Sequence, residues 1–377
     1  MKASKRVLMT ADTIDGLWRY AVTLAGALAH RDWQVLLAAF GPAPDDGQRA
    51  QIEVLDGVKL VAAELPLDGA GADRRSMEAA AATLAEIVRR ESCDLVHLNT
   101  PMLAAAGNWP VPVIGVAHGC LSTWRAGARV GARAGKRDDD MAWRRQMMLE
   151  GLVACDRLIA PTLAFADELA SACAVDRPIE VVYNGTLPHL PAGLEHGAPF
   201  AFTAGRLWDE VENIALLDGV AARLQEPFIA AGTSKGSRGQ QARFDHLRVL
   251  GQLSERAIRA HLARRPVFVS AAVFEPFSLA VLEAAHAGCP LVLSDIASFH
   301  ELWGGAATFI DAVDEDGYVE AIETLLRDAD LRHRLGNAAR CRAMDYSVKA
   351  MADAMVTQYE GVLKERQSAR GLPSCVD

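Results

Sequence analysis

The sequence predicts an α/β protein with two doubly wound, parallel-sheet domains that face each other across a cleft. Short apolar runs alternate with stretches of helical periodicity along the chain. A Gly- and Pro-rich stretch at 184–199 interrupts this alternation, which then starts again. The 377 residues are 51% hydrophobic and include 30 glycines, which is enough apolar material for two cores. Strand–helix alternation implies parallel sheets with right-handed crossovers.

The first half of the chain contains a series of short apolar runs that are bounded by turn residues. These runs predict strands at Arg6–Thr10, Gln34–Phe40, Leu95–Leu98, Val113–Ala117, Arg157–Ala160 and Glu180–Tyr183. Apolar residues three and four positions apart predict helices at Trp18–Arg31, Arg75–Arg90, Asp139–Ala154 and Thr162–Ala172.

The second half repeats the same alternation after the interruption. Strands are expected at Phe200–Ala204, Phe228–Ala231, Arg248–Leu250, Val267–Ser270 and Leu291–Ser294. Helices are expected at Asn213–Leu224, Glu255–Ala263, Leu279–Ala287, Tyr318–Asp328 and Ser347–Lys364. Ligands of such sheets bind at the carboxyl ends of the strands, so two facing domains would share one cleft.

The composition argues against several classes of protein. A net charge of −9 disfavours a general nucleic-acid binder. No apolar stretch is long enough to span a bilayer or to serve as a signal peptide. The seven scattered cysteines form no Cys-x-x-Cys pair, so neither a disulfide framework nor a zinc site is expected. A reducing cytoplasm is the expected location.

The loop after the strand Val267–Ser270 is the first candidate site. Pro276 tolerates a position just before a helix or in its first turn. The N–H groups of Phe277, Ser278 and Leu279 would then lack intrahelical acceptors. Together with the helix dipole they predict a site for a phosphate group.

Two acids flank this helix tip. Glu275 precedes the turn, and Glu283 lies about one and a half turns into the helix. Carboxylates so near a bound phosphate suit a ligand with a sugar or ribose, because they accept hydrogen bonds from its hydroxyl groups. The alternative is that Glu275 caps the helix and Glu283 lies on a solvated face.

Several segments resemble one known family. EPFSLAVLEAAHAGCPLVLSDIASFHEL, which begins at Glu275, resembles the glutamate–seven–glutamate segment of the retaining GT-B glycosyltransferases of the family 4 type. Other segments resemble further parts of that family, in the same order: AHGCLSTW, LIAPTLAFADEL, VVYNG, FTAGRLWDE and YSVKAMADAMVTQYEGVL. The resemblance covers most of the chain and implies the GT-B fold, with two Rossmann-like domains facing a cleft.

The resemblance also implies a division of the chain. The expected parts are an N-terminal acceptor-side domain (1–185) joined by the C-terminal helix (347–366), a linker (186–199), a nucleotide-sugar-binding domain (200–346) and a tail (367–377). The donor would be held in the second domain.

Roles for individual residues follow from the family motif. Glu275 would hold donor-sugar hydroxyls, with Pro276 beside it, and the amides of 277–279 would hold the distal phosphate. Glu283 would hold the ribose diol. Leu253 in LGQLSE would lie near the nucleobase.

Other implied residues come from three further loops. His118 would approach the donor sugar from the N-terminal domain; the alternative is a hydrogen-bonded structural histidine. Arg206 would neutralise the diphosphate, which a planar guanidinium does well; the alternative is a surface salt bridge. Gly16 would let acceptor or phosphate approach the backbone, although a lone glycine there is a weak signal.

The sequence departs from the family near Arg206. The family usually has a lysine where this chain has Glu212. A carboxylate there would repel a diphosphate by roughly 3 kcal/mol per charge pair at about 5 Å. Lys235 and Arg238 in GTSKGSRG are candidates for replacement phosphate contacts. Ser278 stands where a glycine is common, a change expected to be mild.

Taken together, these features predict a metal-independent, retaining glycosyltransferase without a cofactor. It would move a hexose-type sugar from a nucleotide-diphosphate sugar, UDP- rather than GDP-linked, to a hydroxyl of a saccharide or glycolipid. Polysaccharide or glycolipid assembly is the expected setting, in the cytoplasm or weakly bound at the inner membrane face through the basic segment 124–137. The alternatives are a sugar-nucleotide 2-epimerase of the same architecture and, given Glu212, a weakly active nucleotide-sugar-binding protein.

Overall fold

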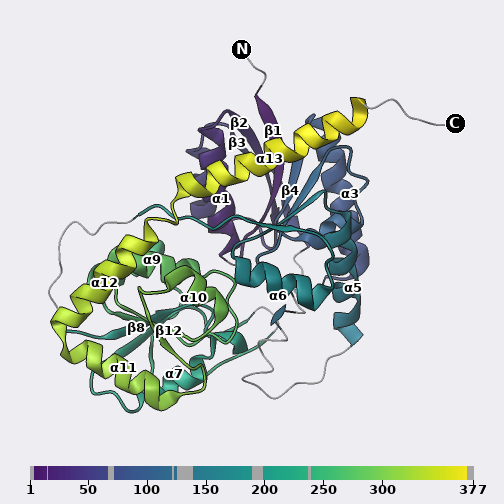
Figure 1. The fold of residues 1–377 in the computed structure, drawn as a ribbon. Helices are drawn as coiled ribbons and strands as arrows, with labels where there is room; N and C mark the ends of the chain where they lie inside the picture. Colours follow the sequence, from purple (N-terminus) through teal and green to yellow (C-terminus); the bar gives the residue numbers. More distant parts are fainter. Residues whose placement is uncertain are drawn as a thin grey trace.

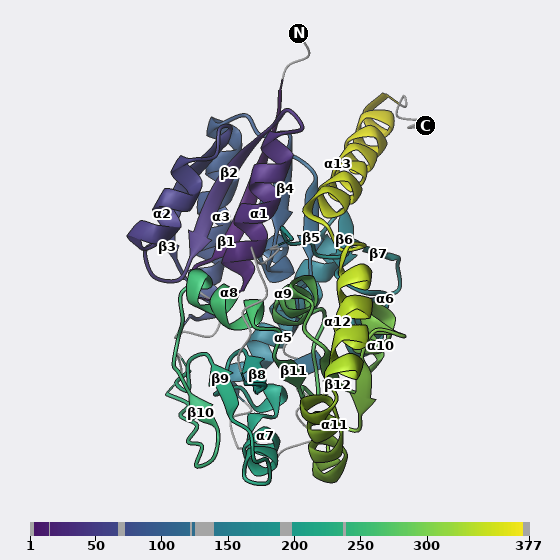
Figure 2. The same ribbon diagram turned by 90° about the vertical axis from the view of Figure 1, so that its left-hand side faces the viewer.

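The computed structural model describes residues 4–14, 16–66, 72–120, 123–124, 139–188, 198–236 and 239–371, without the side chains of 139–141 and 369–371. It contains two parallel sheets, one in each half of the chain (Figures 1 and 2). The first sheet has seven strands in the order β3-β2-β1-β4-β5-β6-β7, and the second has six in the order β10-β9-β8-β11-β12-β13. The predicted fold class is therefore confirmed.

The N-terminal sheet is built from strands that carry apolar side chains on both faces. Its strands are β1 (Lys5–Asp12), β2 (Trp33–Phe40), β3 (Val58–Leu65), β4 (Leu95–Leu98), β5 (Val113–Val116), β6 (Arg157–Ala160) and β7 (Ile179–Val181). The helices and the 3-10 turn between them are α1 (Leu17–Ala29), α2 (Asp46–Glu53), α3 (Arg74–Arg90), η1 (Pro101–Ala105), α5 (Asp139–Ala154) and α6 (Leu163–Cys173).

The C-terminal sheet has shorter strands than the N-terminal sheet. Its strands are β8 (Ala201–Ala204), β9 (Phe228–Ala231), β10 (Arg248–Val249), β11 (Val267–Ser270), β12 (Leu291–Ser294) and β13 (Thr308–Ile310). Its helical elements are η2 (Glu210–Glu212), α7 (Ile214–Ala221), α8 (Glu255–Ala263), α9 (Leu279–Ala287), α10 (Ala297–Trp303), α11 (Glu315–Arg327) and α12 (Ala329–Ala343).

Each sheet separates two apolar clusters, because successive side chains of a buried strand point to opposite faces. In β1, Leu8 belongs to one cluster, whereas Val7 and Met9 belong to the other. In β11, Phe268 and Val269 are divided in the same way. The near-continuous apolar runs of the sequence therefore correspond to strands that are covered on both sides.

The last helix, α13 (Val348–Gly371), returns to the N-terminal half and lies against α1 (Figure 1). Tyr359 on this helix is fully buried, and its ring lies 5.0 Å from that of Trp33 in an edge-to-face arrangement. The phenol oxygen of Tyr359 is 2.6 Å from Nδ1 of His97. None of the described helices is both long enough and apolar enough to cross a bilayer.

The strand orders locate the positions where a ligand is expected. In the first sheet, β1 lies between β2 and β4, so the connections leave in opposite directions at the β1/β4 junction. In the second sheet, β8 lies between β9 and β11 in the same way. Such switch points leave a crevice at the carboxyl ends of the strands. Residues 205–213 and 271–278 follow β8 and β11, so both loops border this crevice.

Hydrogen bonds join the two halves of the chain. The carboxylate of Glu301, on α10, accepts hydrogen bonds from the N–H groups of Leu163 (2.8 Å) and Ala164 (2.7 Å) at the start of α6. Thr162 Oγ1 donates to the carbonyl of Pro276 over 2.9 Å. These contacts place the N-terminal half directly against the donor loop expected from the sequence.

Some elements were not predicted from the sequence, and these omissions have physical causes. Helix α2 is polar and is held by a capping box between Asp45 and Gln48 rather than by an apolar stripe. Strand β3 lies at a sheet edge, and its pairing with β2 contains register shifts that break the alternation. Elements η1, η2, α10, β13 and α12 were also missed. The expected linker residues 189–197, the basic segment 125–137 and residues 372–377 of the tail lie outside the described residues.

Candidate functional site

The loop between β11 and α9 folds around the carboxylate of Glu275. Its Oε1 accepts hydrogen bonds from the N–H groups of Phe277 (3.2 Å) and Ser278 (3.0 Å). Ser298 Oγ donates to the carbonyl of Glu275 over 2.5 Å, which ties the loop to α10. In the ligand-free chain, two of the three amides expected to face phosphate therefore already bind an internal anion. Glu275 thus binds the amides that precede α9, whose N-cap is Ser278, and the phosphate site at this turn stays a prediction.

Ser278 adopts a backbone conformation that suits glycine. Its φ of 64° and ψ of 94° lie where a Cβ is unfavourable, at a cost of about 1–3 kcal/mol. The residue is the N-cap of α9, and its Oγ accepts a long hydrogen bond of 3.4 Å from the N–H of Val281. Serine in place of glycine was expected to be a mild change. Serine keeps the N–H of this position, but its positive φ strains the backbone, so in that respect the expectation is wrong.

Arg206 follows β8 and faces acids from its own loop. Its Nε lies 3.2 Å from Oδ2 of Asp209 and 3.9 Å from Oε1 of Glu212. Oδ1 of Asp209 accepts a hydrogen bond of 3.1 Å from Nε1 of Trp124, which belongs to the N-terminal half. The side chain of Arg206 is 43% exposed, although its Nε is buried.

Glu212 points into this site. Its side chain is only 16% exposed, and its carboxylate oxygens lie 3.1–3.2 Å from the position that a Cβ on Gly205 would occupy. Burial, with a smaller contribution from the charges of Glu275 and Asp209, raises the pKa of Glu212 to about 7, although Arg206 opposes the shift. Burial also raises the pKa of Glu275, which the amides of Phe277 and Ser278 and the charge of Arg206 partly offset.

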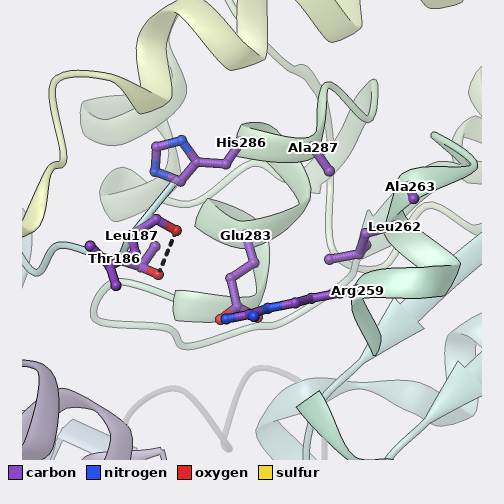
Figure 3. A pocket seen from close by; sticks show the side chains of 8 residues that line it. All are labelled: Thr186, Leu187, Arg259, Leu262, Ala263, Glu283, His286 and Ala287. Atoms are coloured by element: carbon purple, nitrogen blue, oxygen red, sulfur yellow. Dashed lines mark hydrogen bonds between the residues drawn. The ribbon is translucent and has the colours of Figure 1, made fainter. Parts of the chain in front are cut away.

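Glu283 forms an ion pair across the two halves of the molecule. Its Oε1 contacts Nη1 of Arg19 on α1. Burial raises the pKa of Glu283, and Arg19 counteracts that shift. Glu283 also lines a pocket of about 400 Å³ with Arg259 and His286 (Figure 3). The solvated-face alternative for Glu283 does not hold, since its side chain is only 20% exposed.

His118 belongs to a buried polar chain in the N-terminal half. Its Nε2 lies 2.9 Å from Oδ1 of Asn99, and Nε2 of His97 lies 3.0 Å from the same oxygen. An amide oxygen only accepts, so both imidazoles donate to it through Nε2, which leaves Nδ1 of neutral His118 as an acceptor. Burial lowers the pKa of His118 to about 3, and the charge of His97 adds to the shift. Neutral His118 can therefore accept a hydrogen bond from a hydroxyl group.

A second pocket lies at the switch point of the N-terminal sheet. It measures about 280 Å³ and is lined by Thr10, Asp12, Leu17 and Asn99, among other residues. Gly16 is the N-cap of α1 with a φ of −56°, and a Cβ built there meets no atom within 4 Å. The backbone thus does not require glycine at position 16, but the space in front of it is open.

Three further predicted contacts are Lys235, Arg238 and Leu253. Lys235 is exposed, and among the described residues its side chain makes no ion pair with the Arg206 loop or the α9 tip. Arg238 lies outside the described residues. Leu253 is half-buried and packs against the apolar cluster beneath α9.

The structure adds residues that the sequence did not single out. Arg19, Asn99 and Asp209 contact Glu283, His118 and Arg206, respectively. The position of Asn99 directly after β4, at a carboxyl strand end, was a usable signal. For Arg19 and Asp209 the sequence carried none, because each contact joins residues whose proximity depends on the tertiary structure or on the path of a loop.

Comparisons with known proteins agree with this architecture. The family model of Glycosyltransferase Family 4 matches residues 14–188, and that of Glycosyl transferases group 1 matches residues 239–342. Among solved structures, sucrose-phosphate synthase from Thermosynechococcus elongatus superimposes with a TM-score of 0.77 at 16% identity, covering 96% of this chain and 100% of that one. HepE from Anabaena, in complex with UDP-glucose, gives a TM-score of 0.71 at 14% identity, covering 94% and 99%.

Two curated relatives match a shorter stretch. Glycogen synthase from Mycobacterium tuberculosis is 33% identical over 130 residues, which are 33% of this chain and 31% of the relative. Phosphatidyl-myo-inositol mannosyltransferase from Mycobacterium leprae is 30% identical over 123 residues, or 31% and 32%. The chain thus spans about a third of the length of these relatives. With both family models matched in succession on two facing Rossmann-like halves, the chain belongs to the GT-B glycosyltransferases of the family 4 type.

Proposed function

We propose that this protein is a retaining glycosyltransferase that moves a hexose-type sugar from a nucleotide-diphosphate sugar to a hydroxyl acceptor. One observation carries the proposal: Arg206, Glu275 and the N-terminal tip of α9 meet at the β8/β11 switch point. A guanidinium and a helix tip bind a diphosphate, and a carboxylate binds sugar hydroxyls. This combination fits a donor with both groups.

The chemistry follows from where charge develops. As the bond from the sugar to the diphosphate breaks, negative charge grows on the leaving phosphate. Arg206 and the amides of 277–279 would stabilise this charge once the amides of Phe277 and Ser278 exchange their bonds to Glu275 for bonds to the phosphate. Glu275 would hold the sugar and Glu283 the ribose diol. The acceptor hydroxyl attacks from the same face and passes its proton to the departing phosphate oxygen. The guanidinium and helix dipole supply the positive charge, so the proposed reaction requires no metal.

The base of the donor is proposed from structural neighbours. HepE is a solved neighbour in complex with UDP and with UDP-glucose, which favours UDP over GDP for this chain. The relatives named for glycogen synthesis and for mannosyl transfer favour a hexose. The acceptor would lie in the pocket of the N-terminal sheet, whose Thr10, Asp12 and Asn99 offer hydrogen bonds to a saccharide or glycolipid. His118 would contact the donor sugar beside it.

The first prediction tests Glu275. Glu275→Ala should lower transfer by about 100-fold or more, since an interaction made in the transition state is lost. Release of UDP from UDP-glucose, with and without saccharide acceptors, measures the effect. Glu275→Gln keeps an oxygen for the amides of Phe277 and Ser278 and separates folding from function. Full activity of both variants would refute the assignment, and an epimerised sugar nucleotide formed without acceptor would identify an isomerase.

A second candidate function rests on Glu212. Among the residues that the structure describes, three acids surround the guanidinium of Arg206, which weakens its attraction for a diphosphate. A nucleotide-sugar-binding protein with little transferase activity fits that arrangement. Binding of UDP-glucose in calorimetry without turnover in any acceptor screen would favour this function.

A further inference from the structure

The acids around Arg206 outnumber it. Asp209 and Glu212 approach the guanidinium from its own loop and η2, and Glu275 approaches from the loop after β11. With all three ionised, the charged groups of this cluster that the structure describes carry a net negative charge. A diphosphate adds further negative charge at the same place. The site therefore has to lose negative charge for a donor to bind well.

The three acids differ in the hydrogen bonds that they accept. Asp209 lies nearer to the guanidinium than Glu212 does, and it accepts hydrogen bonds from Nε1 of Trp124 (3.1 Å) and the N–H of Val211 (3.3 Å). Glu275 accepts from two loop amides, which oppose the rise in its pKa that burial causes.

Glu212 accepts a hydrogen bond from the backbone N–H of Arg206, which lowers its pKa, but burial opposes this effect more strongly. It lies farther from the guanidinium than Asp209 does, at 3.9 Å, and its carboxylate packs against the backbone of Gly205. The charged groups that act on it are Arg206, Glu275 and Asp209, so two of three repel its negative form. Burial raises its pKa to about 7, so Glu212 exchanges a proton near neutral pH.

We propose that Glu212 binds the donor in its carboxylic acid form, so that each nucleotide-diphosphate sugar brings one proton into the site. The inference rests on the proposed function, because it assigns the diphosphate to Arg206. Protonation removes the repulsion between the Glu212 carboxylate and the diphosphate. It also gives Glu212 an O–H group that can donate a hydrogen bond to a phosphate oxygen. Glu212 thus helps to position the donor, and it loses its negative charge when the donor binds.

Calorimetry with UDP-glucose and GDP-mannose tests this linkage, since their diphosphate diesters keep a constant charge between pH 6.5 and 8.5. With a pKa near 7, the Kd of the wild type should rise about 20-fold over that range. Glu212→Gln should bind with nearly the same Kd at both pH values. The exposed neighbour Glu210→Gln is the matched control and should keep the wild-type dependence. Titrations at pH 8 in buffers of different ionisation enthalpy should show uptake of about one proton by the wild type and none by Glu212→Gln.

The outcomes separate the two proposals. A wild-type Kd that is independent of pH, or a slope that persists in Glu212→Gln, overturns the role of Glu212 and leaves the proposed function standing. Failure of the wild type, Glu212→Gln and Glu212→Lys to bind either sugar nucleotide at any pH overturns the proposed function, and the role of Glu212 with it.

Discussion

Ser278 shows how one residue can hold strain at a ligand-binding turn. Its positive φ is unfavourable for any side chain, yet its N–H donates to Glu275 and its Oγ caps α9. Strain of this type persists where the surrounding structure fixes the backbone. Here β11 and α9 hold the loop from both sides.

We predict that Ser278→Gly stabilises the protein. Relief of the backbone strain should exceed the loss of the long Oγ cap, with a net gain of about 1 kcal/mol and a rise in melting temperature of about 2–4 °C. Ser278→Ala is the control, because it keeps the strain and loses the cap, so it should melt below the wild type. A thermal melt followed by circular dichroism measures both. A lower melting temperature for Ser278→Gly would contradict the strain argument.

Glu212 also predicts a pH dependence of stability. Its pKa is raised from about 4.5 to about 7 in the folded chain, so the folded state keeps a proton that the unfolded state loses. The stabilisation is present in full below pH 4.5 and is lost as the pH rises through 7. Glu212→Gln should therefore melt about 3 °C above the wild type at pH 8 and show a smaller difference at pH 5. Equal differences at the two pH values would show that Glu212 does not titrate with folding.

At the scale of elements, the first N–H groups of helix α6 find their acceptor in the C-terminal half of the chain. Glu301 on α10 accepts hydrogen bonds from the amides of Leu163 and Ala164, and Tyr183 Oη donates to the same carboxylate over 2.9 Å. A negative charge at a helix N-terminus is favourable. The carboxylate of Glu301, in the C-terminal half, therefore caps helix α6 of the N-terminal half.

Removing this cap should loosen the domain contact. Glu301→Ala should lower the free energy of unfolding by about 1–2 kcal/mol, since it leaves two helix amides without their carboxylate. Chemical denaturation followed by fluorescence measures the change. Glu320→Ala, at an exposed position of α11, is the matched control and should alter stability by less than about 0.5 kcal/mol. A loss no larger than that of the control would mean that the contact adds nothing to stability.

For the whole molecule, the ion pair between Arg19 and Glu283 joins the two halves at the residue proposed to hold the ribose. Ribose hydroxyls and the guanidinium would use the same carboxylate. Donor binding and domain position are therefore linked through one side chain, as expected for enzymes whose domains close on a ligand.

Arg19→Met tests this link. Loss of a partly exposed ion pair is worth about 0.2–1 kcal/mol, which should shift the ligand-free chain toward more open conformations by about 2- to 5-fold. Small-angle scattering should give a larger radius of gyration for this variant than for the wild type. Arg31→Met removes an arginine that pairs with Asp353 within the N-terminal half, and it should leave the radius unchanged. Equal effects of the two variants would remove the special role of Arg19.

Much of the fold was accessible from the sequence because buried parallel strands and amphipathic helices have distinct periodicities. Strand Val267–Ser270 and helix Leu279–Ala287 have the predicted bounds. Helix α12 was missed because its sequence, rich in arginine and other polar residues, shows no clear apolar stripe and it is started by Asp328 as an N-cap. Within the site, the sequence located Glu275, Glu283 and Arg206 through a motif, but not the residues that contact them.

By itself, the sequence determined two alternating α/β halves and the turn at residues 275–279, since both depend on local periodicity, proline and helix-capping chemistry. Only the tertiary structure decided that Arg19 reaches Glu283, that Glu301 caps α6, and that Glu212 lies buried among Arg206, Asp209 and Glu275. Those contacts join residues far apart in the chain, and the burial that sets the protonation of Glu212 exists only after both sheets have packed.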